Sequence, residues 1–339
     1  MMRLFKWRNR TRKSQNSDAN RWLDRLVVFV FLSAMFLGGL GFYHVFVAPN
    51  EKQLVVTITD GSSLGKAAHL LKQAGAIRSE EAFLWLVHSK NKFTLKAGDY
   101  QIEPRTSLNH LVTLLEHGPN IRHIFIVPEG MASLEVHDRL MAEPSLVGDI
   151  PVPAEGSLLP DGYAFVPGEK RALVVARMEA AMTKMLHQLW IKKAPDIGVK
   201  IPEQAVILAS IVEKETALPE ERPIVAGVYY NRLQKNMRLQ ADPTIIYPIT
   251  HGYPLGHPIL RSELMAQNSY NTYQIKGLPS GPITNPSRSS LMAVLHPAKT
   301  EALYFVANGK GGHIFSNNLE EQSQHVRDYH NRQQQKTSS

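Results

Sequence analysis

The longest run of hydrophobic positions lies near the N-terminus, from Leu26 to Val47, and His44 is its only residue that can carry a charge near neutral pH. As an α-helix this run spans roughly 33 Å, close to the thickness of the hydrocarbon core of a bilayer. It is too long for the hydrophobic region of a signal peptide, and no small-x-small cleavage site follows it. We therefore predict an uncleaved transmembrane helix over residues 26–47, with a cleaved signal peptide as the alternative.

Between residues 50 and 120 the hydrophobic pattern predicts a small α+β module. The β-branched run Leu54–Thr59 is typical of a short strand, and the turn at Ala97–Tyr100 leads into a second one. Serines precede three amphipathic stretches and predict helix starts at Ser63, Ser79 and Ser107. No catalytic arrangement of side chains falls here. We predict a binding or spacer domain, and a domain that only packs is the alternative.

Residues 121–332 predict a larger, mixed α/β domain. A strand is expected over Arg122–Val127, and a long amphipathic helix over Leu173–Ile191. A hairpin is predicted where a glycine-rich turn separates two short runs, Leu303–Val306 and His313–Ser316. The turn is not a phosphate-binding loop, because it lacks the spacing and the following helix of such a loop. Residues 333–339 predict a disordered tail. The fold class expected for the whole chain is α+β.

Charge is concentrated at the N-terminus. The formal net charge is +8, and residues 1–25, with eight basic and two acidic side chains, carry +6 of it. The positive-inside rule then places this basic segment in the cytoplasm and the chain from about residue 50 on the outer side of the membrane. The nearly neutral remainder argues against a nucleic-acid-binding body. The absence of cysteine excludes disulfide bonds, thiolate metal sites and a cysteine nucleophile.

Candidate chemistry lies at the end of a helix that Pro202 begins. Glu213 and Glu215 are two residues apart, so they point to nearly opposite sides of that helix. Glu215 continues an apolar stripe, which predicts partial burial, a raised pKa and the ability to act as a general acid. Glu213 is expected to be solvated or structural. The alternative is that Glu215 forms an ion pair with Arg222, Arg232 or Arg238.

The helix expected over Pro219–Leu233 and the segment after it add further polar groups. Asp242 precedes Pro243 and is most economically an N-cap. Asn231 and Gln240 are neutral hydrogen-bonding residues suited to sugar hydroxyls and N-acetyl groups. The loop Glu155–Tyr163 carries two carboxylates, yet on its own it is best explained as an ordinary turn. No strong metal-ligand spacing occurs, so we predict neither a metal nor a cofactor.

The chain contains a series of short motifs that, in their order along the sequence, resemble those of the endolytic murein transglycosylase family, the YceG-like proteins. Gly98-Asp99-Tyr100 and the loop at Pro160-Asp161 are similar to family motifs as well. The chain departs from the family pattern at Leu159, Gly162, Asn236, Ser280 and Ser287. The motifs that carry the resemblance are Ala209–Thr216, Asn231–Leu233, Met237–Gln240, Asp242–Tyr247, Tyr270–Tyr273, Gly277–Pro279, Gly281–Ile283, Asn285-Pro286, Leu303–Val306 and His313–Phe315.

The resemblance implies a single-pass protein of the bacterial inner membrane, with its catalytic domain in the periplasm and a LysM-like subdomain over residues 50–120. It implies that the second glutamate of the Glu-Lys-Glu motif, Glu215, is the catalytic acid. It also implies cleavage of the bond between N-acetylmuramic acid and N-acetylglucosamine, formation of 1,6-anhydro ends, termination of nascent strands and work beside peptidoglycan synthases. The candidates for holding the glycan are Asn231, Gln240, Tyr247, Asn271 and Tyr273.

Two other functions stay open at this point. A muramidase-type hydrolase needs a second carboxylate beside Glu215, and Glu213, Glu155 and Asp161 are the candidates. A non-catalytic peptidoglycan-binding scaffold would need no acid at all.

Overall fold

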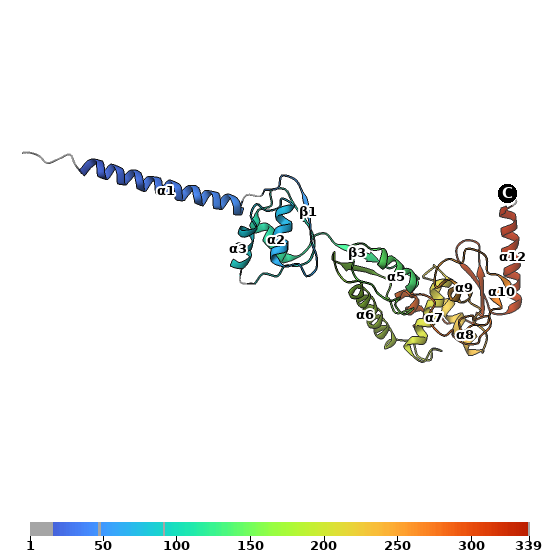
Figure 1. Cartoon of the computed structure of the whole chain (residues 1–339). Coiled ribbons are helices and arrows are strands. Elements are labelled where there is room, and N and C mark those ends of the chain that lie inside the picture. The colour runs from blue at the N-terminus through green and yellow to red at the C-terminus, as the bar shows by residue number, and fades with distance from the viewer. Residues whose placement is uncertain (1–15, 47–48, 91, 338–339) are drawn as a thin grey trace, which may run out of the picture. The chain divides into compact units, whose positions relative to one another are not determined.

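The computed structural model describes residues 16–46, 49–90 and 92–337. Within these ranges helices predominate, and the strands form three separate two-stranded antiparallel sheets (Figure 1). The chain divides into two compact units, Met1–Ile121 and Arg122–Ser339. This mixture of helices and antiparallel strands confirms the predicted α+β class.

The first helix, α1 (Asn16–Phe46), begins ahead of the predicted span, so the described part of the basic segment is helical too. Its stretch Arg21–Tyr43 is long and apolar enough to cross a membrane. Large apolar side chains along it are exposed, which suits a helix that faces lipid. Residues 1–15 of the predicted basic segment and residue 47 of the predicted span lie outside the described residues.

After α1, the first unit has the predicted order of strand, helix, helix, strand and helix. Each of these three helices begins after a serine whose side chain accepts a backbone N–H: Ser63, Ser79 and Ser107. The two strands pair antiparallel, with Leu54 opposite Ile102, and the helices cover them with one apolar core. The elements are β1 (Leu54–Ile58), α2 (Leu64–Gln73), α3 (Glu80–Ser89), β2 (Gly98–Ile102) and α4 (Leu108–His117).

The second unit begins with an antiparallel pair of strands that pack on two helices. The strand β4 (Gly162–Phe165) was not predicted, because the run Pro160-Asp161-Gly162 favours a turn. In the structure the turn ends at Asp161, and β4 pairs with β3 so that Gly162 lies opposite Ile126. The other elements here are β3 (His123–Ile126), α5 (Ser133–Ala142) and α6 (Arg171–Trp190).

The centre of the second unit is α7 (Pro202–Glu215), and α6, α8, α9 and α11 all pack against it. Nearly all its residues from Ala205 to Glu213 are buried. The predicted hairpin is confirmed as β5 and β6, with Tyr304 opposite Ser316. The elements after α7 are α8 (Arg222–Gln234), α9 (Pro243–Thr250), α10 (Arg261–Leu264), α11 (Arg288–Leu295), β5 (Tyr304–Ala307), β6 (His313–Ser316) and α12 (Leu319–Thr337).

The last helix, α12, extends through Thr337, whereas a disordered tail was expected from residue 333. The segment Gln333–Thr337 reads Gln-Gln-Gln-Lys-Thr, and glutamine and lysine continue an existing helix at little cost. Residues 338–339 of the expected tail lie outside the described residues.

Candidate active site around Glu215

Glu215 is the last residue of α7 and is partly exposed. The hydroxyl of the buried Tyr229, on α8, donates a hydrogen bond of 2.8 Å to its Oε1. Burial raises the pKa of Glu215 to about 7. The hydrogen bond from Tyr229 works against this rise, the negative charge of Asp242 adds to it, and the positive charge of Arg232 opposes it. Glu215 can therefore both donate and accept a proton near neutral pH.

Asp242 is the carboxylate whose charge acts on Glu215, and its predicted role as a side-chain N-cap is wrong. It stands at the N-cap position of α9 but makes no capping hydrogen bond. Its φ and ψ of −53° and −41° are already helical, whereas a capping side chain folds back from an extended residue. Its Oδ1 instead accepts a hydrogen bond of 2.6 Å from the hydroxyl of Tyr273. Tyr273, a predicted glycan ligand, thus lies at the site.

Arg232 supplies positive charge near Glu215 without forming an ion pair with it. Its guanidinium is buried and donates to two carbonyl oxygens, those of Leu303 and Leu239, each at 2.6 Å. Among the residues that the structure describes, no ion pair within 4.0 Å involves Glu215, and Arg222 pairs with Glu213 instead. The alternative prediction, an ion pair between Glu215 and one of these arginines, is therefore wrong for the described residues.

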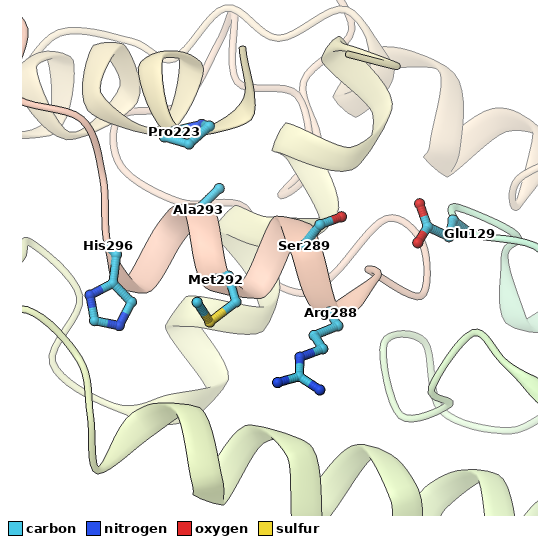
Figure 2. Close-up of a pocket in the computed structure, with 7 residues that line it drawn as sticks. All are labelled: Glu129, Pro223, Arg288, Ser289, Met292, Ala293 and His296. Carbon is cyan, nitrogen blue, oxygen red and sulfur yellow. The ribbon is translucent and has the colours of Figure 1, made fainter. Parts of the chain in front are cut away.

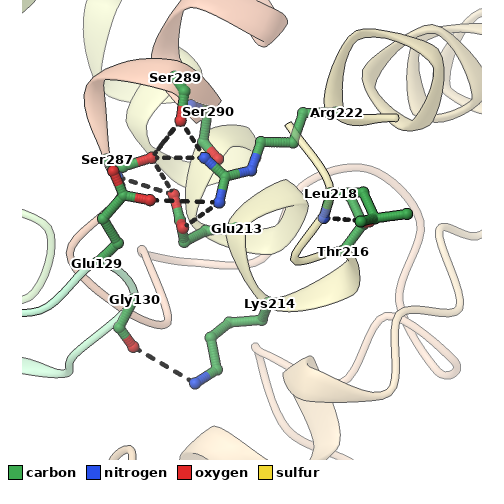
Figure 3. Close-up of polar contacts among 10 residues, drawn as sticks. All are labelled: Glu129, Gly130, Glu213, Lys214, Thr216, Leu218, Arg222, Ser287, Ser289 and Ser290. Carbon is green, nitrogen blue, oxygen red and sulfur yellow. Dashed lines mark hydrogen bonds and ion pairs between the residues drawn. The ribbon is translucent and has the colours of Figure 1, made fainter. Parts of the chain in front are cut away.

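Glu213 is structural, and it is not solvated. Its side chain is 3% exposed and that of Arg222 is 5% exposed, and its Oε1 lies 3.0 Å from Arg222 Nη2. Its Oε2 accepts hydrogen bonds from the backbone N–H of Ser287 at 2.9 Å and from the Ser287 hydroxyl at 2.5 Å. Figure 3 shows how Glu129 and Ser289 complete the cluster around the guanidinium. Glu213 thus fastens the end of α7 to the starts of α8 and α11.

The remaining predicted carboxylates have partners of their own. Glu155 accepts the backbone N–H of Ser133 at 2.9 Å, and burial raises its pKa while its contact with Tyr247 opposes that rise. The side-chain carboxylate of Asp161 accepts only the adjacent N–H of Gly162 among the hydrogen bonds of the described residues. The second carboxylate that the hydrolase alternative requires is therefore best supplied by Asp242, which was not among the candidates.

Two of the predicted glycan ligands have internal roles. Asn271 is fully buried, and its amide nitrogen donates to the carbonyl oxygens of Glu263, Leu264 and Ala266. The amide of Asn231 donates to carbonyl oxygens in the segment 300–302. We therefore assign both to the support of loops, because a side chain with these partners would have to break them to bind a sugar.

The other two candidates lie on the surface or near it. Gln240 is exposed and has a positive φ of 50°. Tyr247 is partly exposed and its ring centroid lies 5.2 Å from that of Tyr270. Both remain predicted glycan ligands.

Sequence reasoning missed Tyr229 and Asp242 as neighbours of Glu215, and it considered Arg232 only as an ion-pair partner. Tyr229 is buried, and a buried tyrosine hydroxyl needs a hydrogen-bond partner, which was the available signal. Arg232 and Asp242 are close to Glu215 only through the packing of α8 and α9. Among the described residues, no group of three or more histidines, aspartates or glutamates could hold a metal ion.

A groove of about 470 Å³ lies over α11, and Glu215 is not among its lining residues (Figure 2). Arg288, Met292 and His296 lie along the exposed side of the helix, and Pro223 and Ala293 form its floor. Its lining is mainly apolar, and Glu129 and Ser289 connect it to the Glu213 cluster.

Comparisons with known proteins identify the family of the chain. Residues 56–328 match the model of the YceG-like family. An endolytic murein transglycosylase of Bacillus subtilis is 27% identical over 324 residues, covering 86% of this chain and 89% of that protein. One of Streptococcus pneumoniae is 28% identical over 359 residues, and this match covers 89% of the chain but 64% of the relative. The crystal structure of a YceG-like protein from Listeria monocytogenes gives a TM-score of 0.51 at 27% identity, covering 80% of this chain and 98% of that one. The chain therefore belongs to the YceG-like family, as its motifs predicted.

Proposed function

We propose that this protein is a lytic transglycosylase that cleaves the glycan strands of peptidoglycan, with Glu215 as its acid and base. The observation that carries this proposal is a partly exposed glutamate with a pKa of about 7, held by the hydroxyl of Tyr229. Such a group has the protonation behaviour that glycosidic bond cleavage requires. The names of the relatives in Bacillus subtilis and Streptococcus pneumoniae support the same activity.

The proposed reaction uses one carboxyl group twice. Protonated Glu215 donates its proton to the oxygen that joins C1 of N-acetylmuramic acid to N-acetylglucosamine, and the C1–O bond breaks. The positive charge that develops at C1 is stabilised by the ring oxygen and the neighbouring N-acetyl group. The Glu215 carboxylate then takes the proton of the C6 hydroxyl, and the C6 oxygen bonds to C1. The products are a 1,6-anhydro end and a strand with a free 4-hydroxyl, and no water is consumed.

The neighbours of Glu215 suit this sequence of steps. The negative charge of Asp242 favours the protonated acid and also favours the cationic sugar that follows. The hydrogen bond from Tyr229 fixes the carboxyl group while it loses and regains its proton. Tyr273, bonded to Asp242, is the first candidate for direct contact with the glycan.

A second candidate function follows from Asp242. A carboxylate close enough to raise the pKa of Glu215 could also activate a water molecule or attack the sugar, as the second carboxylate of a muramidase does. The products separate the two reactions, because hydrolysis leaves a reducing end that is heavier than the anhydro end by one water molecule.

The experiment is a digest of purified sacculi by the full-length protein in detergent, with products identified by mass spectrometry. Anhydro ends are expected with the wild-type protein and are expected to be missing with Glu215→Gln. Reducing ends in their place would favour the muramidase. No cleavage by either protein would favour a non-catalytic, peptidoglycan-binding scaffold.

The acid role also predicts a pH dependence. Glu215 must carry its proton at the start, so kcat/KM is expected to be high below pH 7 and to fall as the pH rises through about 7. Asp242→Asn removes a negative charge that raises this pKa, and the midpoint of the fall should move to lower pH. The control is Asp161→Asn, whose carboxylate accepts an N–H within its own turn. An unchanged midpoint in Asp242→Asn would contradict the coupling.

We further propose that Arg21–Tyr43 anchors the protein in the bacterial inner membrane, with the basic N-terminus in the cytoplasm and the chain from about residue 50 on the periplasmic side. There the enzyme would work beside peptidoglycan synthases and terminate nascent strands. Residues 50–120 would form a LysM-like domain that binds N-acetylated glycans, and the βααβα order of this segment supports this role.

A further inference from the structure

The hairpin β5–β6 contributes a histidine to the surroundings of the active site that the proposed reaction does not use. His313 is the first residue of β6, and its backbone N–H donates to Glu221 Oε1 at 2.7 Å. Its ring Nδ1 lies 2.6 Å from Glu221 Oε2. Glu221 precedes the first residue of α8, and both side chains are largely buried. His313 thus binds both oxygens of one carboxylate.

This carboxylate connects His313 to the residue that follows Glu215. The hydroxyl of Thr216 donates to Glu221 Oε2 at 2.9 Å, and Thr216 is itself 4% exposed. Burial raises the pKa of Glu221, but the hydrogen bonds from His313 and Thr216 outweigh it and leave the pKa below its usual value. The carboxylate therefore stays ionised, and bonds to an ionised acceptor are stronger than those between neutral groups.

A second connection runs through aromatic rings. The ring of His313 meets that of Phe305 edge-on, with centroids 5.4 Å apart. Phe305 in turn meets Tyr229 edge-on at 6.1 Å, and the hydroxyl of Tyr229 donates a hydrogen bond to Glu215. His313 is therefore connected to Glu215 in two ways: through Thr216, which follows Glu215 in the chain, and through Tyr229, which donates a hydrogen bond to Glu215.

The turn before His313 is shaped for this contact. A Cβ atom at Gly312 would lie 2.6 Å from Glu221 Oε1, so a larger residue here would displace the Glu221 carboxylate from its hydrogen bonds. The N–H of Gly312 donates to Asn308 Oδ1, which closes the turn. The absence of a side chain at Gly312 thus leaves room for the Glu221 carboxylate beside the hairpin.

We propose that His313 is a positioning residue for Glu215, acting through Glu221 and Thr216 on one side and through Phe305 and Tyr229 on the other. The inference rests on the proposed function, because it concerns the same acid. His313 fixes the C-terminal turn of α7 and the tyrosine hydroxyl relative to each other, so that the carboxyl group meets the glycosidic oxygen in one orientation. Misplacement of a catalytic group by about 1 Å can lower a rate roughly 100-fold.

The test compares three substitutions of His313 in the full-length protein. His313→Ala removes the ring from both connections and leaves only the backbone N–H bonded to Glu221. His313→Asn keeps a side-chain donor near the position of Nδ1, and His313→Phe keeps the ring contact with Phe305 without that donor. His296→Asn, at the exposed end of α11, is the matched control. The measurements are kcat and KM on sacculus-derived glycan strands, the pH profile of kcat/KM, and the melting temperature.

We expect His313→Ala to lower kcat by roughly 30- to 100-fold with KM within about threefold, and to move the pH midpoint assigned to Glu215. His313→Asn should recover most of kcat, His313→Phe only part of it, and His296→Asn should match the wild type. Wild-type kcat and pH midpoint in His313→Ala would overturn the proposal, as would a loss of melting temperature that accounts for the whole loss of activity. An inactive wild-type protein, or an active Glu215→Gln, would instead overturn the proposed function.

Discussion

Glu215→Gln is expected to reduce the rate of glycan cleavage by about 100- to 10,000-fold, the range that a positioned general acid contributes. Glutamine has nearly the same shape and can still accept the hydrogen bond from Tyr229, so the fold should be retained. It has no proton to donate to the glycosidic oxygen. The measurement is the release of soluble fragments from sacculi at pH 6.5, where the wild-type acid is mostly protonated.

Glu215→Gln should lower the activity but raise the stability of the folded protein above pH 7. An unfolded glutamate loses its proton near pH 4.5, whereas Glu215 in the folded protein keeps its proton up to about 7. Stability is therefore lost as the pH rises from 4.5 to 7, and ionisation costs the folded state at most about 3 kcal/mol. Glu215→Gln should be more stable than the wild type at pH 8 and no more stable at pH 4. Full activity, or a large loss of stability at pH 8, would contradict the assignment of Glu215.

Arg222→Ala is expected to destabilise the second unit by about 3–5 kcal/mol, because it leaves the carboxylate of Glu213 buried without its counter-ion. The charge on Glu213 would keep only the two hydrogen bonds from Ser287. The same change removes the bonds of Arg222 to the hydroxyls of Ser287 and Ser289 at the start of α11. Chemical denaturation, followed by tryptophan fluorescence, measures the free energy of unfolding.

The matched control is Glu129→Gln, which removes the other carboxylate that contacts Arg222. Glu129 is 57% exposed and lies 3.4 Å from Arg222 Nη2, so its loss should cost no more than about 1 kcal/mol. The double substitution Glu213→Leu with Arg222→Met removes both buried charges together and should recover most of the stability lost in Arg222→Ala. Equal effects of Arg222→Ala and Glu129→Gln would show that the buried pair contributes little.

Much of the secondary structure followed from periodicity and caps. The helix starts after Ser63, Ser79 and Ser107 were predicted because a serine side chain at an N-cap acts on its own helix. The hairpin β5–β6 was predicted because two short apolar runs flank glycines. The strand β4 was missed because Pro160-Asp161-Gly162 favours a turn, and only the pairing with β3, which precedes α5, makes the residues after Asp161 a strand.

The surroundings of the two glutamates were only partly predictable. The sequence analysis treated the helix from Pro202 as having one buried and one solvated side. On that basis it placed Glu215 in the apolar stripe and Glu213 on the opposite side. In the structure α7 lies at the centre of the unit and is buried on both sides. Glu213 meets Ser287, which is 74 residues away in the chain, at the start of a helix that the sequence analysis did not predict.

From the sequence alone came the family, the apolar N-terminal segment and the choice of Glu215 as the acid, because motifs and the spacing of apolar residues along one helix are local properties. Tertiary structure decided what surrounds that acid: Tyr229 as its donor, Asp242 and Arg232 as the nearby charges, and Arg222 as the partner of Glu213. A helical repeat specifies which residues share a side of a helix. It does not specify which helices, strands and loops pack against that side, and the pKa of a carboxyl group depends on those neighbours.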